Sequence, residues 1–332
     1  MLRSMYSGIS GLKNHQTKLD VIGNNISNVN TYGYKKSRVV FQDLVSQSIS
    51  GASSPTATMG GVNPKQVGLG SQMAAIDVIH GTGSLQTTSR TLDLAISGDG
   101  FFMVADSTEA PADVDGEMVI PAEGGFSNYL YTRAGNFYMD ANGYLVNAEG
   151  KYVVGVANDT LYADPEADPI VSNAETDKID VGTGTLFEEG ELDVTVGGGT
   201  SDATANDLGP IKIPTNAQSM SIGQDGTVTY VDVNGQLQYA GQLLLAKFPN
   251  TGGLEKAGNN YYSPTTNSGD PTVQVATQAG IGKIQSGFLE MSNVDLSEEF
   301  TEMIVAQRGF QANSRIITTS DEILQELVNL KR

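Results

Sequence analysis

The stretch MYSGISGLKNHQTKLDVIGNNISNVNTYGYKK, residues 5–36, joins a seven-residue apolar repeat to a turn around Gly33. A repeat with this spacing is typical of an amphipathic helix that packs against another helix. It predicts a helix of about 27 residues, roughly 40 Å long at 1.5 Å per residue. The apolar stripe comprises Met5, Leu12, Leu19 and Ile26, with a partial second row at Ile9, Ile22 and Val29.

Asn24, Asn25 and Asn28 lie beside the apolar face near the end of this helix. Because asparagine is a poor helix former, a frayed helix end is the simplest interpretation. The amide is also both a donor and an acceptor, so these side chains can instead hold the helix in register against neighbouring chains. Gly33 stands between two tyrosines and permits a sharp exit with positive φ.

A second repeat with the same spacing lies near the other terminus. Asp295 can cap its first turn while Glu298 reaches back to the cap. Packing on an ordinary globular core is one interpretation of two such helices. Since neither has an adjacent helix in the sequence, burial on each other or on other copies, as a coiled-coil assembly, is favoured. The apolar row of this C-terminal repeat comprises Leu296, Met303, Phe310, Ile317 and Leu324, and Phe300, Leu327 and Leu330 widen it.

The middle of the chain carries strand and turn signals. Asn142-Gly143, Asp225-Gly226 and Asn234-Gly235 each separate two alternating apolar runs, which is the strongest short-range signal of a β-hairpin. LDLAISGDGFFMV, residues 92–104, alternates and then turns at its glycines. Residues 51–64 contain many glycines, serines and prolines and indicate a flexible loop or extended arm. A mainly β domain is therefore predicted between the two helices.

The 332 residues include 38 acidic and 19 basic side chains, an excess that argues against binding to nucleic acid. The acidic residues are concentrated in two stretches. Residues 105–125 hold six acids and no base, and residues 157–208 hold thirteen acids and one lysine. Like charges at this density resist burial, so both stretches are expected to face solvent. The second predicts a small inserted β-rich subdomain.

Few residues could support catalysis or bind a metal. There is no cysteine, and only His15 and His80 could supply an imidazole. Asp140-x-Asn142-Gly143 starts like a calcium loop but lacks the glycine and the acid that such a loop needs later. No pair of carboxylates is singled out. We therefore expect no enzyme activity, cofactor or metal, and the sequence shows neither a cleavable signal core nor a membrane span.

Four stretches, in a fixed order, carry a family resemblance. They are residues 1–44, LDLAISGDGFF at 92–102, YTRAGNFYMDANGYLVNAEG at 131–150, and residues 287–332. Together they resemble the bacterial flagellar rod and hook axial proteins, and they leave only the two acidic stretches unmatched. The N-terminal hallmark is an Asn-Asn-Ile-x-Asn-x-Asn-Thr-x-Gly-[FY]-Lys run, which matches this chain at Asn24, Asn25, Asn28, Asn30, Gly33, Tyr34 and Lys35.

The resemblance implies an α+β multi-domain chain within a tubular polymer. Residues 1–30 and 294–332 would pair as an inner coiled-coil layer, to which the stripe residues above contribute. Residues 31–70 would form a connector arm, and 71–157 with 209–286 the β domain. Residues 158–208 would form the acidic insertion, and 287–293 a second connector.

The resemblance also implies a mechanical function. Residues 1–11, the 31–34 turn and 292–317 are most similar to hook subunits, which build a curved, flexible tube that transmits motor torque. The long segment 46–65 is shared instead with distal rod subunits, which build a straight drive shaft. A secreted β-rich binding or adhesive module is the alternative from another class. The implied location is the extracellular flagellum. The implied partners are further copies of the chain, the flagellar type III export apparatus, a hook cap, a distal rod protein and a hook–filament junction protein.

Overall fold

A computed structural model describes residues 2–55, 59–107, 112–114, 117–119, 126–157, 208–278 and 280–330. Contacts divide the chain into two compact units. The helical unit comprises Met1–Val29, Lys35–Ile79 and Val294–Arg332, and the β unit comprises Asn30–Tyr34 and His80–Asn293. The expected acidic insertion lies outside the described residues, apart from its last residue.

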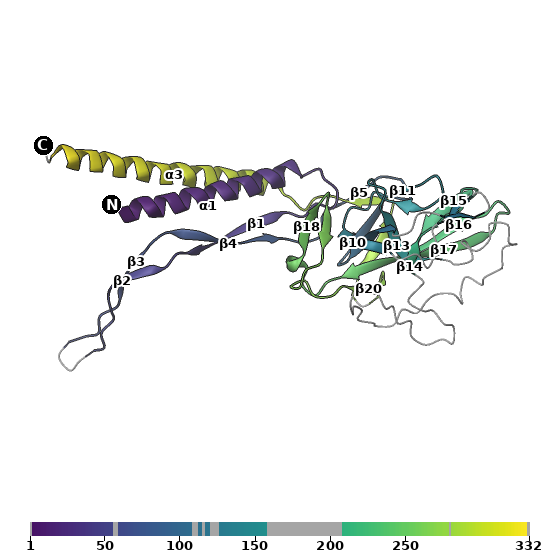
Figure 1. Ribbon diagram of the computed structural model, residues 1–332, viewed down its shortest axis with the longest axis horizontal. Helices are drawn as coiled ribbons and strands as arrows, with labels where there is room; N and C mark the ends of the chain where they lie inside the picture. The colour runs from purple at the N-terminus through teal and green to yellow at the C-terminus, as the bar shows by residue number, and fades with distance from the viewer. Residues whose placement is uncertain are drawn as a thin grey trace. The chain divides into compact units, whose positions relative to one another are not determined.

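Helices α1 (Leu2–Ser27) and α3 (Leu296–Asn329) lie side by side and antiparallel in the helical unit (Figure 1). They confirm the two helices predicted from the heptad spacing, and the predicted Asp295 cap accepts a hydrogen bond from Ser297 N at 2.8 Å. Glycines allow the helices to approach closely. A Cβ on Gly11 would lie 2.6 Å from Nδ2 of Asn313, and a Cβ on Gly309 would lie 2.6 Å from the His15 ring. A side chain at either glycine would displace the Asn313 amide or the His15 ring from its place.

The contact between these helices includes residues of the predicted stripes, such as Ile22 and Ile317, together with residues outside them. The buried positions of α3 are Glu299, Ala306 and Ser320, which share one heptad row. Ile22 and Asn25 are buried on α1. The apolar row predicted for α3 lies beside this buried row. Glycines in the contact leave room for side chains of the facing helix, namely the Asn313 amide at Gly11 and the His15 ring at Gly309.

A two-stranded arm completes the helical unit. Strand β1 (Ser37–Asp43) pairs antiparallel with β4 (Ser71–Val78), and β2 (Ser46–Ser50) pairs with β3 (Lys65–Gly68). A bridge between Ser53 and Val62 continues the pairing into the 51–64 segment. The segment is therefore part of an extended arm. Its exposed strands gain little stability from each other, because an isolated hairpin is marginal in water.

Short strands form the β unit. The strands that join its main antiparallel sheet are β7 (Phe101–Ser107), β10 (Phe126–Thr132), β11 (Tyr138–Met139), β12 (Leu145–Val146), β13 (Tyr152–Ala157), β14 (Leu208–Pro210), β15 (Ser219–Ile222), β16 (Thr227–Val231), β17 (Leu237–Lys247), β18 (Glu255–Gly258), β19 (Tyr261–Ser263) and β20 (Thr272–Val275). Separate pairs are β21 (Lys283–Ser286) with β6 (Leu94–Ser97), β22 (Phe288–Glu290) with β5 (Leu85–Thr87), and β8 (Ala112–Val114) with β9 (Glu117–Val119).

The core of the β unit lies on both faces of β7 and β17, which pair with each other. Phe102 and Leu245 belong to one buried apolar cluster, while Phe101 and Ala246 belong to a second. Successive side chains of a strand point to opposite faces, so an uninterrupted apolar run is buried on both sides. This is why the FFMVA and LLLA runs show no alternation between apolar and polar residues.

The three predicted hairpins are confirmed. Gly143, Gly226 and Gly235 all have positive φ, at +88°, +86° and +76°. They turn the chain between β11 and β12, β15 and β16, and β16 and β17. The turn after residue 97 differs, because β6 pairs with β21 while β7 enters the main sheet.

A buried ion pair joins distant segments of the β unit. Arg133 Nη1 lies 3.3 Å from Glu290 Oε2, and both side chains are almost fully buried. Arg133 Nη2 donates to the Gly98 carbonyl at 2.8 Å, and Glu290 Oε1 accepts from Gly83 N at 2.8 Å. Burial lowers the pKa of the Arg133 guanidinium, and Glu290 opposes that change. The pair links β22 to the loops that follow β6 and β10.

The expected connector 287–293 belongs to the β unit and contains β22, and the division into units differs from the expected boundaries at two further places. Residues 71–79, expected in the β domain, pair with β1 in the helical unit. Residues 30–34, divided in the expectation between the first helix and the arm, belong to the β unit. Sequence signals for strands do not indicate which sheet a strand joins, and this accounts for the difference at residues 71–79.

Removing one partner of the buried pair tests its contribution to stability. Arg133→Met should lower the free energy of unfolding of the β unit by about 3–5 kcal/mol, because Glu290 would be left as an uncompensated buried charge. Urea titration followed by near-UV circular dichroism of the tyrosines measures this change. Lys151→Met is the matched control, since Lys151 pairs at 2.7 Å with an Asp106 that is 44% exposed. Its cost should be at most about 1 kcal/mol. Equal costs for the two variants would contradict the prediction.

Candidate assembly surface

The N-terminal stripe is largely covered within one chain. Ile22 is buried, and Met5, Leu12, Leu19, Ile26 and Val29 are partly buried. Helix α3 contacts this helix, while β1 and β4 pack against it as well. Most of the predicted α1 residues therefore already have neighbours within their own chain.

The C-terminal stripe is more exposed. Phe300 is 50% exposed and Phe310 is 38% exposed, and Leu296 is also exposed. Met303, Ile317 and Leu324 are partly exposed. Helix α3 has 34 residues and α1 has 26. The single chain thus presents an apolar face along α3, which is the kind of surface that a further helix can cover.

Asn25 connects three segments of the helical unit. Its Nδ2 donates to the Ser37 carbonyl at 2.9 Å and to Glu299 Oε2 at 3.2 Å. Its Oδ1 accepts from Ser37 N at 3.0 Å. The amide side chain pairs with the first residue of β1 as a neighbouring peptide group would. It fixes the end of α1 against both β1 and α3.

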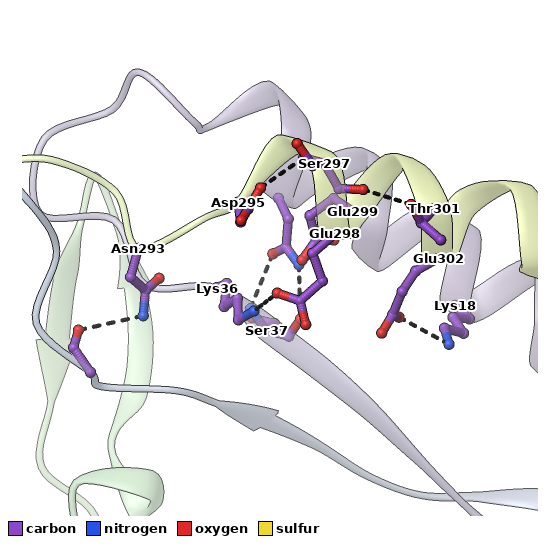
Figure 2. A network of polar contacts seen from close by, with 12 residues as sticks. Lys18, Lys36, Ser37, Asn293, Asp295, Ser297, Glu298, Glu299, Thr301 and Glu302 are labelled. Carbon is purple, nitrogen blue, oxygen red and sulfur yellow. Dashed lines mark hydrogen bonds and ion pairs between the residues drawn. The ribbon is translucent and has the colours of Figure 1, made fainter.

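Two ion pairs flank this contact, as Figure 2 shows. Lys36 Nζ lies 2.7 Å from Glu298 Oε2, and Lys18 Nζ lies 3.0 Å from Glu302 Oε2. The sequence predicted that Glu298 reaches back to the helix cap at Asp295. In the structure its carboxylate pairs instead with Lys36, just before β1. The Asn25–Glu299 and Lys18–Glu302 contacts join α1 to α3, while the Lys36–Glu298 pair joins α3 to the residue before β1.

Glu299 is buried among these groups. Burial raises the pKa of its carboxyl group, while the hydrogen bond from Asn25 and the charge of Lys36 lower it. A raised pKa means that the ionised carboxylate disfavours the folded state, and that protonation as the pH falls relieves this cost. Asn25 is the hydrogen-bonding partner that offsets part of that cost.

The other signature asparagines have different positions. Asn28 Nδ2 donates to both the carbonyl and the side-chain oxygen of Asn24, each at 2.9 Å, and Asn30 is exposed. Contact of these side chains with neighbouring chains remains a prediction. Asn25 was expected to hold the helix in register against neighbouring chains. In the structure its hydrogen bonds are to Ser37 and Glu299 of its own chain.

The turn after α1 is held by the β unit. Gly33 has φ of +68°, which confirms the predicted positive value. Gly33 N donates to the Glu290 carbonyl at 2.8 Å, and Asn260 Nδ2 donates to the Tyr32 carbonyl at 3.1 Å. Lys256 lies over the Tyr34 ring at 4.9 Å. A Cβ on Gly33 would collide with the backbone at Arg133, so this position requires glycine. Lys35, the last signature residue, is fully buried.

The arm has an unusual composition for this chain. Residues 44–76 contain one charged side chain, Lys65, in a protein with net charge −19. Its exposed apolar residues include Val45, Ile49 and Val67. A surface with few charges and several apolar side chains can be covered by another chain at little desolvation cost. The arm is therefore a second candidate contact surface.

The described part of the chain has neither a cluster of metal ligands nor a membrane-spanning helix. No group of three or more histidine or acidic side chains is placed to hold a metal ion there. Among the helices of the same residues, none has the length and hydropathy of a membrane span. Among the described residues, the face of α3 and the arm expose apolar side chains that are suited to contacts between chains.

Three family models match the chain. They are described as flagella basal body rod protein (residues 5–35), flagellar hook protein FlgE/F/G D1 domain (118–230) and flagellar basal body rod FlgEFG protein C-terminal (285–330). Superposition on the crystal structure of Helicobacter pylori flagellar hook protein FlgE2 gives a TM-score of 0.36 at 13% identity. It covers 62% of this chain and 100% of that one.

Curated relatives match over the whole length. The chain is 50% identical to the flagellar basal-body rod protein FlgG of Bacillus subtilis, with 100% of both chains covered. It is 34% identical over 460 positions to the flagellar hook protein FlgE of Borreliella burgdorferi, and 31% identical over 335 positions to the rod protein FlgG of the same organism. Both of these alignments also cover 100% of each chain. The chain therefore belongs to the family of bacterial flagellar rod and hook axial proteins.

Proposed function

We propose that this protein is the structural subunit of the flagellar hook, which polymerises into a curved, flexible tube and transmits torque from the rod to the filament. The observation that carries assembly is the apolar face of α3, with Phe300 and Phe310 exposed in the single chain. In the polymer, this face is covered by terminal helices of other copies in an inner coiled-coil layer. The β units lie further out.

The comparison within one organism supports the hook over the rod. Against Borreliella burgdorferi, identity is 34% over 460 positions for the hook protein and 31% over 335 positions for the rod protein. The chain therefore shares more identical positions with that hook protein. Since both relatives come from the same organism, the difference does not reflect distance between species.

A distal rod subunit is the second candidate, and two observations favour it. The Bacillus subtilis relative at 50% identity is named a basal-body rod protein. The arm with β2 and β3 is also long enough to add a contact between neighbouring subunits, which would stiffen the tube. A secreted adhesive module has no specific observation in its favour, because family membership accounts for both ends of the chain.

The proposed assembly implies a set of partners. Copies of the chain add head to tail through different patches, as an open helical array requires. The flagellar type III apparatus exports the subunit, and a hook cap retains it during addition. The distal rod protein and the hook–filament junction protein adjoin the two ends of the tube.

Phe310→Asp should abolish polymerisation while leaving the single chain folded. Phe310 is 38% exposed, so a charge there costs little until another chain must bury it. Sedimentation of the polymer and near-UV circular dichroism of the β unit measure the two effects. Gln311→Asp is the matched control, since this exposed polar residue is the next position on α3, and it should still polymerise. Polymers of Phe310→Asp with unchanged critical concentration would refute the role of this face.

Asn25→Ala should raise the critical concentration for polymerisation. It leaves Ser37 and Glu299 without three hydrogen bonds at a partly buried site, a loss of about 1–3 kcal/mol, or roughly five- to 150-fold. Asn24→Ala removes an exposed neighbour and should stay within about twofold, since exposed substitutions change little. Equal shifts for both variants would mean that the Asn25 contacts do not matter for assembly.

Electron microscopy of polymers formed by the purified chain separates hook from rod. Supercoiled tubes whose curvature changes with salt and pH are expected for the hook. Tubes that stay straight under all conditions would refute the hook assignment and favour the rod. Replacing residues 46–68 by Gly-Gly tests the arm. If the arm stiffens the tube, its removal should increase curvature.

A further inference from the structure

His15 occupies the junction of three elements in the helical unit. It lies on α1, and a Cβ added to Gly309 of α3 would come within 2.6 Å of its ring atoms Cε1 and Nε2. The Phe41 ring of β1 is 6.5 Å from the imidazole, measured between ring centroids. The absence of a side chain at Gly309 thus creates the space that the imidazole fills. Neither the predicted stripes nor the contacts in Figure 2 assign a role to this side chain.

The surroundings of the ring favour its neutral form. Nδ1 is buried and has no hydrogen-bond partner among the described residues. Protonation of the imidazole makes both ring nitrogens donors, so the cation would need an acceptor at the buried Nδ1, while the ring's neighbours include Phe41 and Gly309. Burial and the charge of Lys18 lower the pKa of His15 below 6.5.

The charged groups of the surrounding elements do not compensate a His15 cation. On α1, Lys18 repels it, and the Glu302 carboxylate of α3 is paired with Lys18 at 3.0 Å. Across the strand pair, Arg38 of β1 faces Asp77 of β4 at 3.6 Å. The other charged side chains of these elements are Arg3, Lys13 and Asp20 on α1, Glu298, Glu299, Arg308, Arg315, Asp321, Glu322 and Glu326 on α3, and Asp43 on β1.

We propose that His15 is an acid-sensitive lock that holds α1, α3 and β1 together when neutral and releases them when protonated. The lock deepens the proposed function, because it makes assembly through the terminal helices dependent on pH. The sign follows from linkage. A histidine whose folded pKa is depressed contributes stability that is present above its unfolded pKa and is lost as the pH falls below it. Neutral surroundings therefore favour assembly, and acidic surroundings favour release.

The expected size of the pH effect on folding follows from the binding of one proton to His15. If the folded form stays neutral and the unfolded imidazole titrates at 6.5, the folding constant of the helical unit falls by about tenfold between pH 7.5 and 5.5. Most carboxylates remain ionised in this window. Glu299, whose pKa is raised, responds in the opposite direction, and comparison with a His15 variant removes its contribution.

The critical concentration for polymerisation, measured by sedimentation at pH 7.5 and pH 5.5, tests the lock. For the wild-type chain it should rise by up to about tenfold at the lower pH. His15→Gln, a neutral side chain of similar reach, should remove most of that rise. His80→Gln in the β unit is the matched control and should keep it, because His80 is the other of the two histidines. The proposal would be overturned if the critical concentration rose equally for wild type and His15→Gln. It would also be overturned if His80→Gln abolished the rise and His15→Gln did not.

A failure of polymerisation is distinguishable from a failure of the lock. If no polymer forms at either pH, the proposed function fails. The pH response is then read from far-UV circular dichroism and thermal unfolding of the helices in the unassembled chain. Helix content that falls in acid for the wild type but not for His15→Gln supports the lock in that case as well. An identical response of the two chains, or no response in either, would again overturn it.

Discussion

The close approach of α1 and α3 is the constraint on which the helical unit depends. At Gly11 and Gly309 the space between the helices is filled by the Asn313 amide and the His15 ring, which leaves no room there for a further side chain. The contact also depends on polar side chains with defined hydrogen-bond partners. The Asn25 side chain makes three such hydrogen bonds. Large apolar residues of α3 lie exposed on a neighbouring face. The pairing of the helices within one chain thus leaves an apolar surface for others.

The β unit is stabilised by its own core. Its main sheet has buried side chains on both faces of its central strands, so its stability does not require another chain. The Arg133–Glu290 pair and the Gly33 contact tie the first turn and the last strand to this core. The β unit thus buries its apolar core within the single chain, while the helical unit exposes apolar side chains on α3 and the arm. This asymmetry suits a subunit whose body is rigid and whose ends assemble.

The sequence predicted the elements better than their partners. Heptad spacing identified both helices, and Asn-Gly and Asp-Gly pairs identified the hairpins, because these signals arise from neighbouring residues. Glu299 and Ser320 are polar residues that are buried on α3, so their burial could not be read from hydrophobicity. Asn25 was singled out as a possible register residue, but its partners Ser37 and Glu299 lie 12 and 274 positions away. The assignment of β4 to β1 also depends on long-range pairing, which local patterns do not contain.

The nearly uncharged arm has a consequence for the chain before it assembles. Exposed strand edges with apolar side chains and few charges are prone to non-specific pairing with other chains. Proteins usually protect such edges with lysines or prolines along the strand. Here residues 44–76 provide Lys65 as their one charge, while the whole molecule carries a net charge of −19. Mutual repulsion between free subunits can supply the protection that the arm lacks. Colloidal stability of the unassembled protein should therefore decrease as salt screens that repulsion.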